Sequence, residues 1–98
     1  MLIYSSVLDA KPGKSGALVS QVAALRDVCA DASGQTWTAW MAVSGRPFGS
    51  FMLATRYDSH AQMIEAGQQI GASAGFQKLS GELAQLLDHP AETGLSEV

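Results

Sequence analysis

Two neighbouring segments carry apolar side chains on both of their faces, and this pattern constrains the fold more than any other feature. Residues 36–44 and 48–57 each read as a β-strand. Successive side chains of a strand point to opposite sides, so Trp37 falls on one face and Trp40 on the other. A small domain with helices on one side of its sheet needs only one apolar face. We therefore expect a homodimer in which the second sheet face packs against another copy of the chain.

The segments before these strands predict a strand and a helix. Residues 2–9 alternate as a strand does, and Pro12-Gly13 ends it. Ser15 is the expected N-cap of the helix that follows, and Ser33-Gly34 is its expected end. One apolar stripe runs along this helix at spacings of three and four residues: Leu18, Val22, Leu25, Cys29 and Ala32. Cys29 is expected to be a small buried apolar residue rather than a catalytic thiol.

A turn around residues 45–47 joins the two central strands, and a second helical region follows them. It begins at Ser59, where Gln62 three residues later completes a capping-box pattern. Ala61 and Ile64 are expected to start its buried face. Glycines predict a break between residues 71 and 75. A second helical piece carries Phe76, Leu79, Leu83 and Leu86 and ends before Pro90, and residues 93–98 form a possible final strand.

The order of these elements is β-α-β-β-α, closing with β if the tail is a strand. It predicts one α+β domain over residues 1–98, with the ferredoxin-like order and an antiparallel sheet. The parts that carry a more specific resemblance are residues 11–14, the strand with both tryptophans, the 51–57 strand with Asp58-Ser59, and the helix over 76–90. On these parts the chain resembles the dimeric α/β-barrel superfamily, and within it the small antibiotic-biosynthesis-monooxygenase-like and NIPSNAP-like proteins.

The resemblance implies a sheet-to-sheet dimer that forms a barrel, with a pocket in each subunit. It also implies a small aromatic ligand, for which the candidate pocket residues are Tyr4, Trp37, Trp40, Arg56, Tyr57 and His60. Tyrosine and tryptophan offer apolar contact plus one donor, and Arg56 offers charge-assisted hydrogen bonds to an oxyanion. We expect the cavity between the sheet and the second helical region, near Trp40, Arg56 and His60, with residues 67–75 as its most deformable wall. The competing interpretation places the aromatics in the core and the dimer interface, Arg56 against a surface carboxylate, and His60 in solvent.

Several classes of chemistry are not expected. Haem-degrading relatives use an asparagine and an axial histidine, but the chain contains no asparagine and residues 72–76 contain no histidine. Gly13-Lys14-Ser15 lacks the first glycine of a phosphate-binding loop. The two histidines lie far apart in sequence, without the ligand clusters that metals require. We therefore expect no cofactor and no metal.

Charge and hydropathy restrict the partners and the location. The six cationic residues are scattered in a chain of net charge −3, so no basic stripe indicates nucleic-acid binding. No apolar run reaches the roughly 20 residues of a membrane span, and the first residues do not have the pattern of a signal peptide. A cytoplasmic protein without nucleic-acid or membrane partners is the expectation.

Two function classes remain open. The first is a small-molecule-binding dimeric α/β-barrel protein with no clear catalytic motif. The alternative is a cofactor-independent monooxygenase or isomerase that acts on an aromatic or polyketide-like substrate, as the resemblance implies. The sequence does not decide whether the protein is an enzyme.

Overall fold

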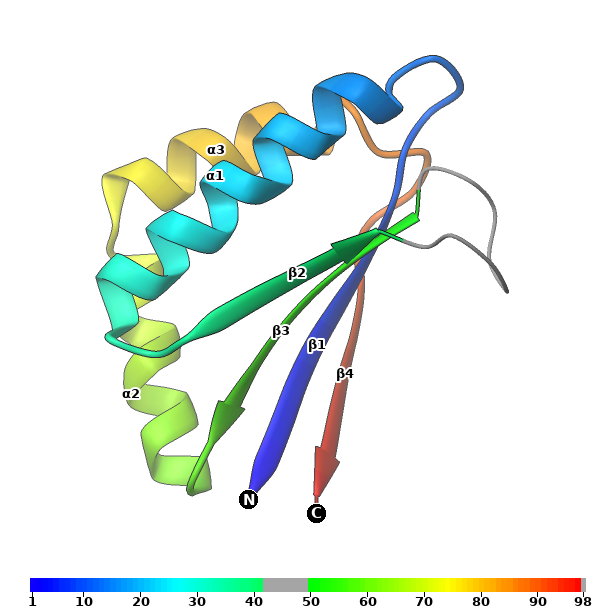
Figure 1. The fold of residues 1–98 in the computed structure, drawn as a ribbon. Helices are drawn as coiled ribbons and strands as arrows, with labels where there is room; N and C mark the ends of the chain where they lie inside the picture. Colours follow the sequence, from blue (N-terminus) through cyan, green and yellow to red (C-terminus); the bar gives the residue numbers. More distant parts are fainter. Residues whose placement is uncertain (42–49, 98) are drawn as a thin grey trace.

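The computed structural model describes residues 1–41 and 50–97. Its elements in chain order are β1 (Leu2–Asp9), α1 (Ser15–Ser33), β2 (Trp37–Met41), β3 (Ser50–Tyr57), α2 (His60–Gly71), α3 (Ala74–Ala84) and β4 (Glu92–Glu97). The described strands form one antiparallel sheet in the order β2-β3-β1-β4. The helices lie together on one side of this sheet (Figure 1). The ferredoxin-like α+β fold and the final strand are confirmed, whereas the turn expected at 45–47 lies outside the described residues.

The first helix follows its apolar stripe. Leu18, Val22, Leu25 and Cys29 are all buried, and Gly34 ends the helix in the left-handed conformation (φ 70°), where its N–H donates to the Ala30 carbonyl. Ser15 as the N-cap is wrong. The Leu18 N–H already donates to the Lys14 carbonyl at 2.9 Å, so Lys14 occupies the cap position and Ser15 is the first helical residue.

The second helical region begins and breaks where the sequence indicates. Ser59 caps α2, because its hydroxyl accepts a hydrogen bond from the Gln62 N–H at 3.2 Å. The helix ends at Gly71, and α3 starts at Ala74.

The face of α2 that was expected to be buried is wrong, because the helix turns a different side toward the sheet. Ile64 is 58% exposed and Ala61 is exposed. Ala66 and Ile70 are buried instead. Met63 and Ala66 pack with Leu2 and Tyr57 of the sheet. This contact turns the side of the helix that carries Met63 and Ala66 inward and leaves the side that carries Ile64 exposed.

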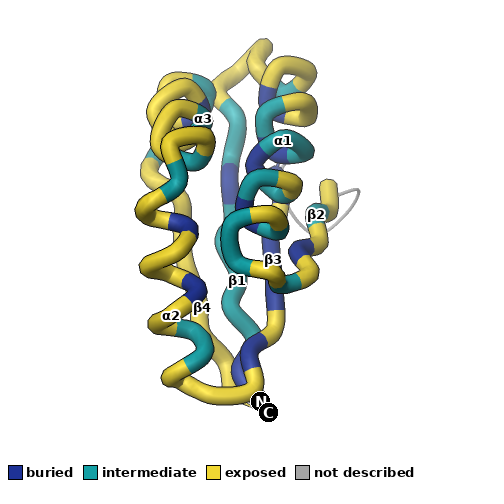
Figure 2. The backbone as a smooth tube through the Cα atoms, turned by 90° about the vertical axis from the view of Figure 1, so that its left-hand side faces the viewer, coloured by how far each residue is buried: buried dark blue, intermediate teal, exposed yellow. Residues whose placement is uncertain are grey.

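The core lies between the sheet and the helices. β3 is mostly buried and β1 is mostly half-buried at the centre of the sheet, whereas β4 is exposed along its length (Figure 2). Leu18, with no exposed surface, is the most completely enclosed large side chain of the main cluster. The described helices leave the opposite sheet face uncovered, and we call it the open face. None of these helices is long and apolar enough to cross a membrane.

Candidate functional site

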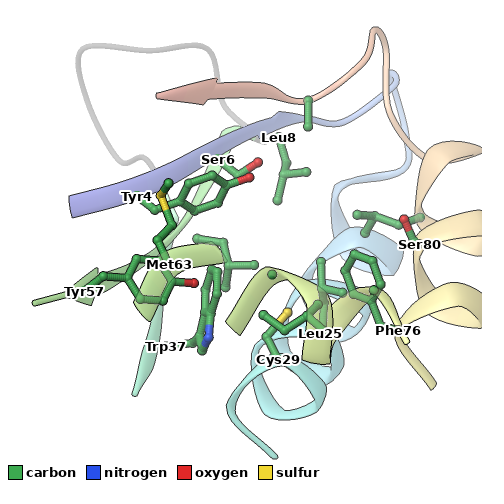
Figure 3. A pocket seen from close by; sticks show the side chains of 16 residues that line it. Tyr4, Ser6, Leu8, Leu25, Cys29, Trp37, Tyr57, Met63, Phe76 and Ser80 are labelled. Atoms are coloured by element: carbon green, nitrogen blue, oxygen red, sulfur yellow. The ribbon is translucent and has the colours of Figure 1, made fainter. Parts of the chain in front are cut away.

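A cavity of about 340 Å³ lies between the sheet and the helices. We call it the helix-side cavity. Its walls are largely apolar and aromatic, with hydroxyl groups at a few points, and they include Tyr4, Ser6, Trp37, Tyr57, Phe76 and Ser80. β1, β2 and β3 provide one wall, and α1, α2 and α3 provide the other. Figure 3 shows the Tyr4 and Tyr57 hydroxyls directed inward from the sheet side.

Strand alternation brings the aromatic side chains together. Tyr4 pairs with Thr55 across β1 and β3, and Trp37 pairs with Thr55 across β2 and β3, so all these side chains share the helix-facing side. The rings of Tyr4 and Trp37 meet edge to face, with centroids 6.0 Å apart and planes at 75°. The Trp37 Nε1–H donates to the Ser33 hydroxyl at 3.3 Å. This hydrogen bond holds the indole as a fixed wall of the cavity.

The ionisable groups of the cavity stay protonated at neutral pH. Burial raises the pKa of the Cys29 thiol to about 11. Burial also raises the pKa values of Tyr4 and Tyr57, because it disfavours the charged form of each phenol. Within the described part of the chain neither phenol has a hydrogen-bond partner, so both hydroxyls can donate to a bound molecule.

The open face carries a second hollow of about 570 Å³, which we call the open-face hollow. It is more polar, and Thr38, Trp40, Arg56, Ala54 and Asp58 are among its lining residues. Arg56 forms no ion pair with any carboxylate of residues 1–41 and 50–97. The sheet itself separates this hollow from the helix-side cavity.

The six candidate residues therefore do not share one pocket. Tyr4, Trp37 and Tyr57 line the helix-side cavity, whereas Trp40 and Arg56 line the open-face hollow. His60 is exposed at the start of α2 and lines neither hollow. The cause is strand alternation, which places Arg56 and Tyr57 on opposite faces although they are neighbours in sequence.

The sequence analysis missed several lining residues. Ser6 follows Tyr4 by two positions on β1, so the same alternation places it on the helix side and was a usable signal. Phe76 and Ser80 come from α3, and no local pattern predicts that α3 closes this end of the cavity. Among residues 1–41 and 50–97, no three His, Cys, Asp or Glu side chains are grouped so that they could hold a metal ion.

Comparisons with known proteins define the class of fold. No protein-family model matches the chain, and no curated protein matches it. Solved structures do match. A NIPSNAP domain protein from Burkholderia xenovorans is 15% identical with a TM-score of 0.83, and the match covers 100% of this chain and 94% of that one.

Two further structures extend this likeness. A NIPSNAP family protein from Agrobacterium tumefaciens is 14% identical with a TM-score of 0.81, over 98% of this chain and 90% of that one. A putative antibiotic biosynthesis monooxygenase from Nitrosomonas europaea is 12% identical with a TM-score of 0.77, over 100% and 98%. The chain thus has the ferredoxin-like fold of the NIPSNAP and antibiotic-biosynthesis-monooxygenase structures. The resemblance seen in the sequence is confirmed as a likeness of fold.

Proposed function

We propose that this protein binds a small, uncharged, largely aromatic molecule in the helix-side cavity and works as a homodimer through the open face of its sheet. The observation that carries the proposal is the cavity wall, where Tyr4, Trp37 and Tyr57 converge and two phenol hydroxyls have no partner among the described residues. Small-molecule sites are typically apolar and aromatic, with a few placed polar groups, and have volumes of roughly 300–1,000 Å³. The cavity volume of about 340 Å³ suits a small ligand.

The lining predicts the charge of the ligand. Among the described lining residues, none is a lysine, arginine, histidine or carboxylate, and the raised pKa values keep both phenols neutral. Burying an unpaired charge is costly, whereas burying a carbonyl that accepts a hydrogen bond is not. A ketone, quinone or phenol ether therefore fits better than a carboxylate of the same shape.

The open face supports the homodimer. Trp40 and Met52 are exposed there, and Val7 pairs with Met52 on the neighbouring strand β1, with part of its surface accessible. Monomers rarely expose contiguous apolar patches of this kind. A second copy of the chain would bury this surface without covering the helix-side cavity.

A cofactor-independent oxygenase or isomerase is the second candidate. The structural likeness to proteins described as antibiotic biosynthesis monooxygenases favours it. In such a reaction Tyr4 and Tyr57 would stabilise an enolate or phenolate oxygen by donating hydrogen bonds. Because these phenols are protonated, the substrate proton would have to leave to solvent rather than to either of them.

Calorimetric titration at pH 7 tests the ligand site. The probes are 2-acetonaphthone, a neutral ketone, and 2-naphthoate, an anion of similar shape. We expect the ketone to bind and the anion to bind far more weakly. Ser6→Leu, which fills the cavity, should abolish binding, whereas Ser20→Leu, the same change on the exposed side of α1, should leave it unchanged.

Arg56→Ala separates the two hollows. If the ketone occupies the helix-side cavity, its affinity for this variant should match the wild type. Loss of binding in Arg56→Ala together with normal binding in Ser6→Leu would move the ligand to the open-face hollow. Binding of neither probe would refute the proposed aromatic-ligand site.

Oxygen uptake tests the second candidate. With 1-naphthol as substrate, one oxygen atom would enter the ring to give 1,4-naphthoquinone and the other would leave as water. Uptake above the protein-free rate that falls in Tyr4→Phe supports an oxygenase. Ketone binding without uptake supports a binding protein that does not oxidise this phenol.

A further inference from the structure

The helix-side cavity reaches the solvent on one side. Most of its lining residues are buried or half-buried, whereas four are exposed: Gly67, Gly71, Ser80 and Ala91. These four belong to α2, to α3 and to the segment just before β4. α2 and α3 pack mainly against α1, and Figure 2 shows them over the β4 side of the sheet. We call the opening bounded by these four residues the mouth.

The rim of the mouth carries only small side chains. Met63, Gly67 and Gly71 are spaced by four residues on α2 and therefore lie on one face of that helix. All three line the cavity. Along two successive turns after Met63, the wall is bare helix backbone.

Neither backbone conformation nor packing requires glycine at these two positions. Among the described residues, positive φ values occur at Gly13 and Gly34, not at Gly67 or Gly71. A Cβ added to Gly67 or Gly71 would meet no atom of the surrounding structure within 4 Å. Glycine inside a helix lowers stability relative to alanine, so what these glycines provide is open space at the mouth.

The hydroxyl groups that can hold a carbonyl lie away from this rim. Tyr57 is only 3% exposed, and its hydroxyl has no hydrogen-bond partner in the part of the chain that the structure describes. Figure 3 shows Tyr57, Tyr4 and Trp37 at one end of the cavity, with Phe76 and Ser80 at the other. A ketone bound to the phenols therefore has its opposite end directed toward the mouth.

We infer that the ligand has two parts: an aromatic ketone enclosed in the helix-side cavity, and a polar or charged chain that leaves through the mouth into solvent. This inference rests on the proposed ligand site and specifies the class of molecule that it takes. A charge is costly where it is buried without a partner, but not where it stays in water. The glycines at positions 67 and 71 leave the space through which such a chain passes.

A ketone with a chain on its far side tests this inference. The probe is 6-(5-carboxypentyloxy)-2-acetonaphthone, which we call the tailed ketone. Its carboxylate ends a flexible chain at the ring position opposite the acetyl group. In calorimetric titration at pH 7 we expect its dissociation constant to lie within ~3-fold of that of 2-acetonaphthone, because the charge stays in water. Ser6→Leu should abolish binding of both ketones, since both place the ring in the cavity.

Leucine at the rim should separate the two ketones. In Gly67→Leu we expect the dissociation constant of the tailed ketone to rise at least ~10-fold, and that of 2-acetonaphthone to change less than ~3-fold, because the added side chain clashes only with the chain. Ser80→Leu obstructs the same mouth from α3 and should give the same difference. The matched control is Gly81→Leu, since Gly81 is exposed on α3, has open space around it and does not line the cavity. It should leave both dissociation constants unchanged, and thermal melts verify the folding of each variant.

The outcomes separate this inference from the proposed function. Binding of 2-acetonaphthone without binding of the tailed ketone refutes the mouth and leaves the proposed site intact. Equal binding of the tailed ketone to the wild type, Gly67→Leu and Ser80→Leu shows that the chain leaves elsewhere, which also refutes the mouth. An equal loss of both ketones in the two rim variants refutes the division into an enclosed ring and an exposed chain. Binding of neither ketone to the wild type refutes the proposed ligand site itself.

Discussion

Leu18→Ala should destabilise the protein more than Leu25→Ala, although both leucines are buried on the same stripe of α1. Each change removes three carbons, which corresponds to a lost transfer free energy of roughly 2.4 kcal/mol at about 0.8 kcal/mol per buried CH₂. A further penalty arises from the space left behind. Leu18 has no exposed surface and does not line the helix-side cavity, so its removal opens a new void.

Leu25 already borders the helix-side cavity, so part of its surface has no packed neighbour to lose. We expect a loss of about 3–5 kcal/mol for Leu18→Ala and about 2–3 kcal/mol for Leu25→Ala, within the range measured for core leucines. Urea denaturation at one fixed protein concentration measures both values, since association would otherwise change the apparent stability. An equal or larger loss for Leu25→Ala would show that the cavity is filled by packed side chains.

Three further changes probe individual elements. Gly67→Ala should stabilise the protein by up to about 1 kcal/mol in chemical denaturation, because a Cβ there meets no atom within 4 Å; destabilisation would contradict that open space. Ser59→Ala should cost about 1 kcal/mol by the same assay through loss of the cap on α2, and no change would show that the cap is dispensable. Hydrogen bonds with the Pro90 carbonyl and the Asp9 carboxylate raise the pKa of His89. Its stabilisation should therefore be complete below its unfolded pKa of about 6.5 and disappear as the pH rises past the higher folded value. The gap in melting temperature between wild type and His89→Gln should narrow as the pH rises from about 6.5 through the raised folded pKa. A gap that widens over the same rise in pH would contradict the direction of this pKa shift.

Short-range periodicity accounts for most of what the sequence predicts correctly. The stripe from Leu18 to Cys29 has a single helical phase, so its buried face has one solution. Strand alternation likewise separates Tyr57 from Arg56. Alternation alone does not say which face the helices cover, and this is why one predicted pocket became two hollows on opposite sides of the sheet.

The phase of α2 shows a second limit. Ala61 and Ile64 form one apolar set, whereas Met63, Ala66 and Ile70 form another, and both sets have helical spacing. Contact with Leu2 and Tyr57 selects the second set, and that contact joins parts of the chain that are distant in sequence. The same holds for the cavity wall from α3, which depends on tertiary packing rather than on a local pattern.

A crystal structure of the protein with 2-acetonaphthone tests the central claim most directly. The account predicts the naphthalene ring in the helix-side cavity against Trp37, with the ketone oxygen about 2.5–3.0 Å from the Tyr4 or Tyr57 hydroxyl. A ketone bound in the open-face hollow beside Arg56, or a helix-side cavity that stays empty at saturating ketone, would contradict it.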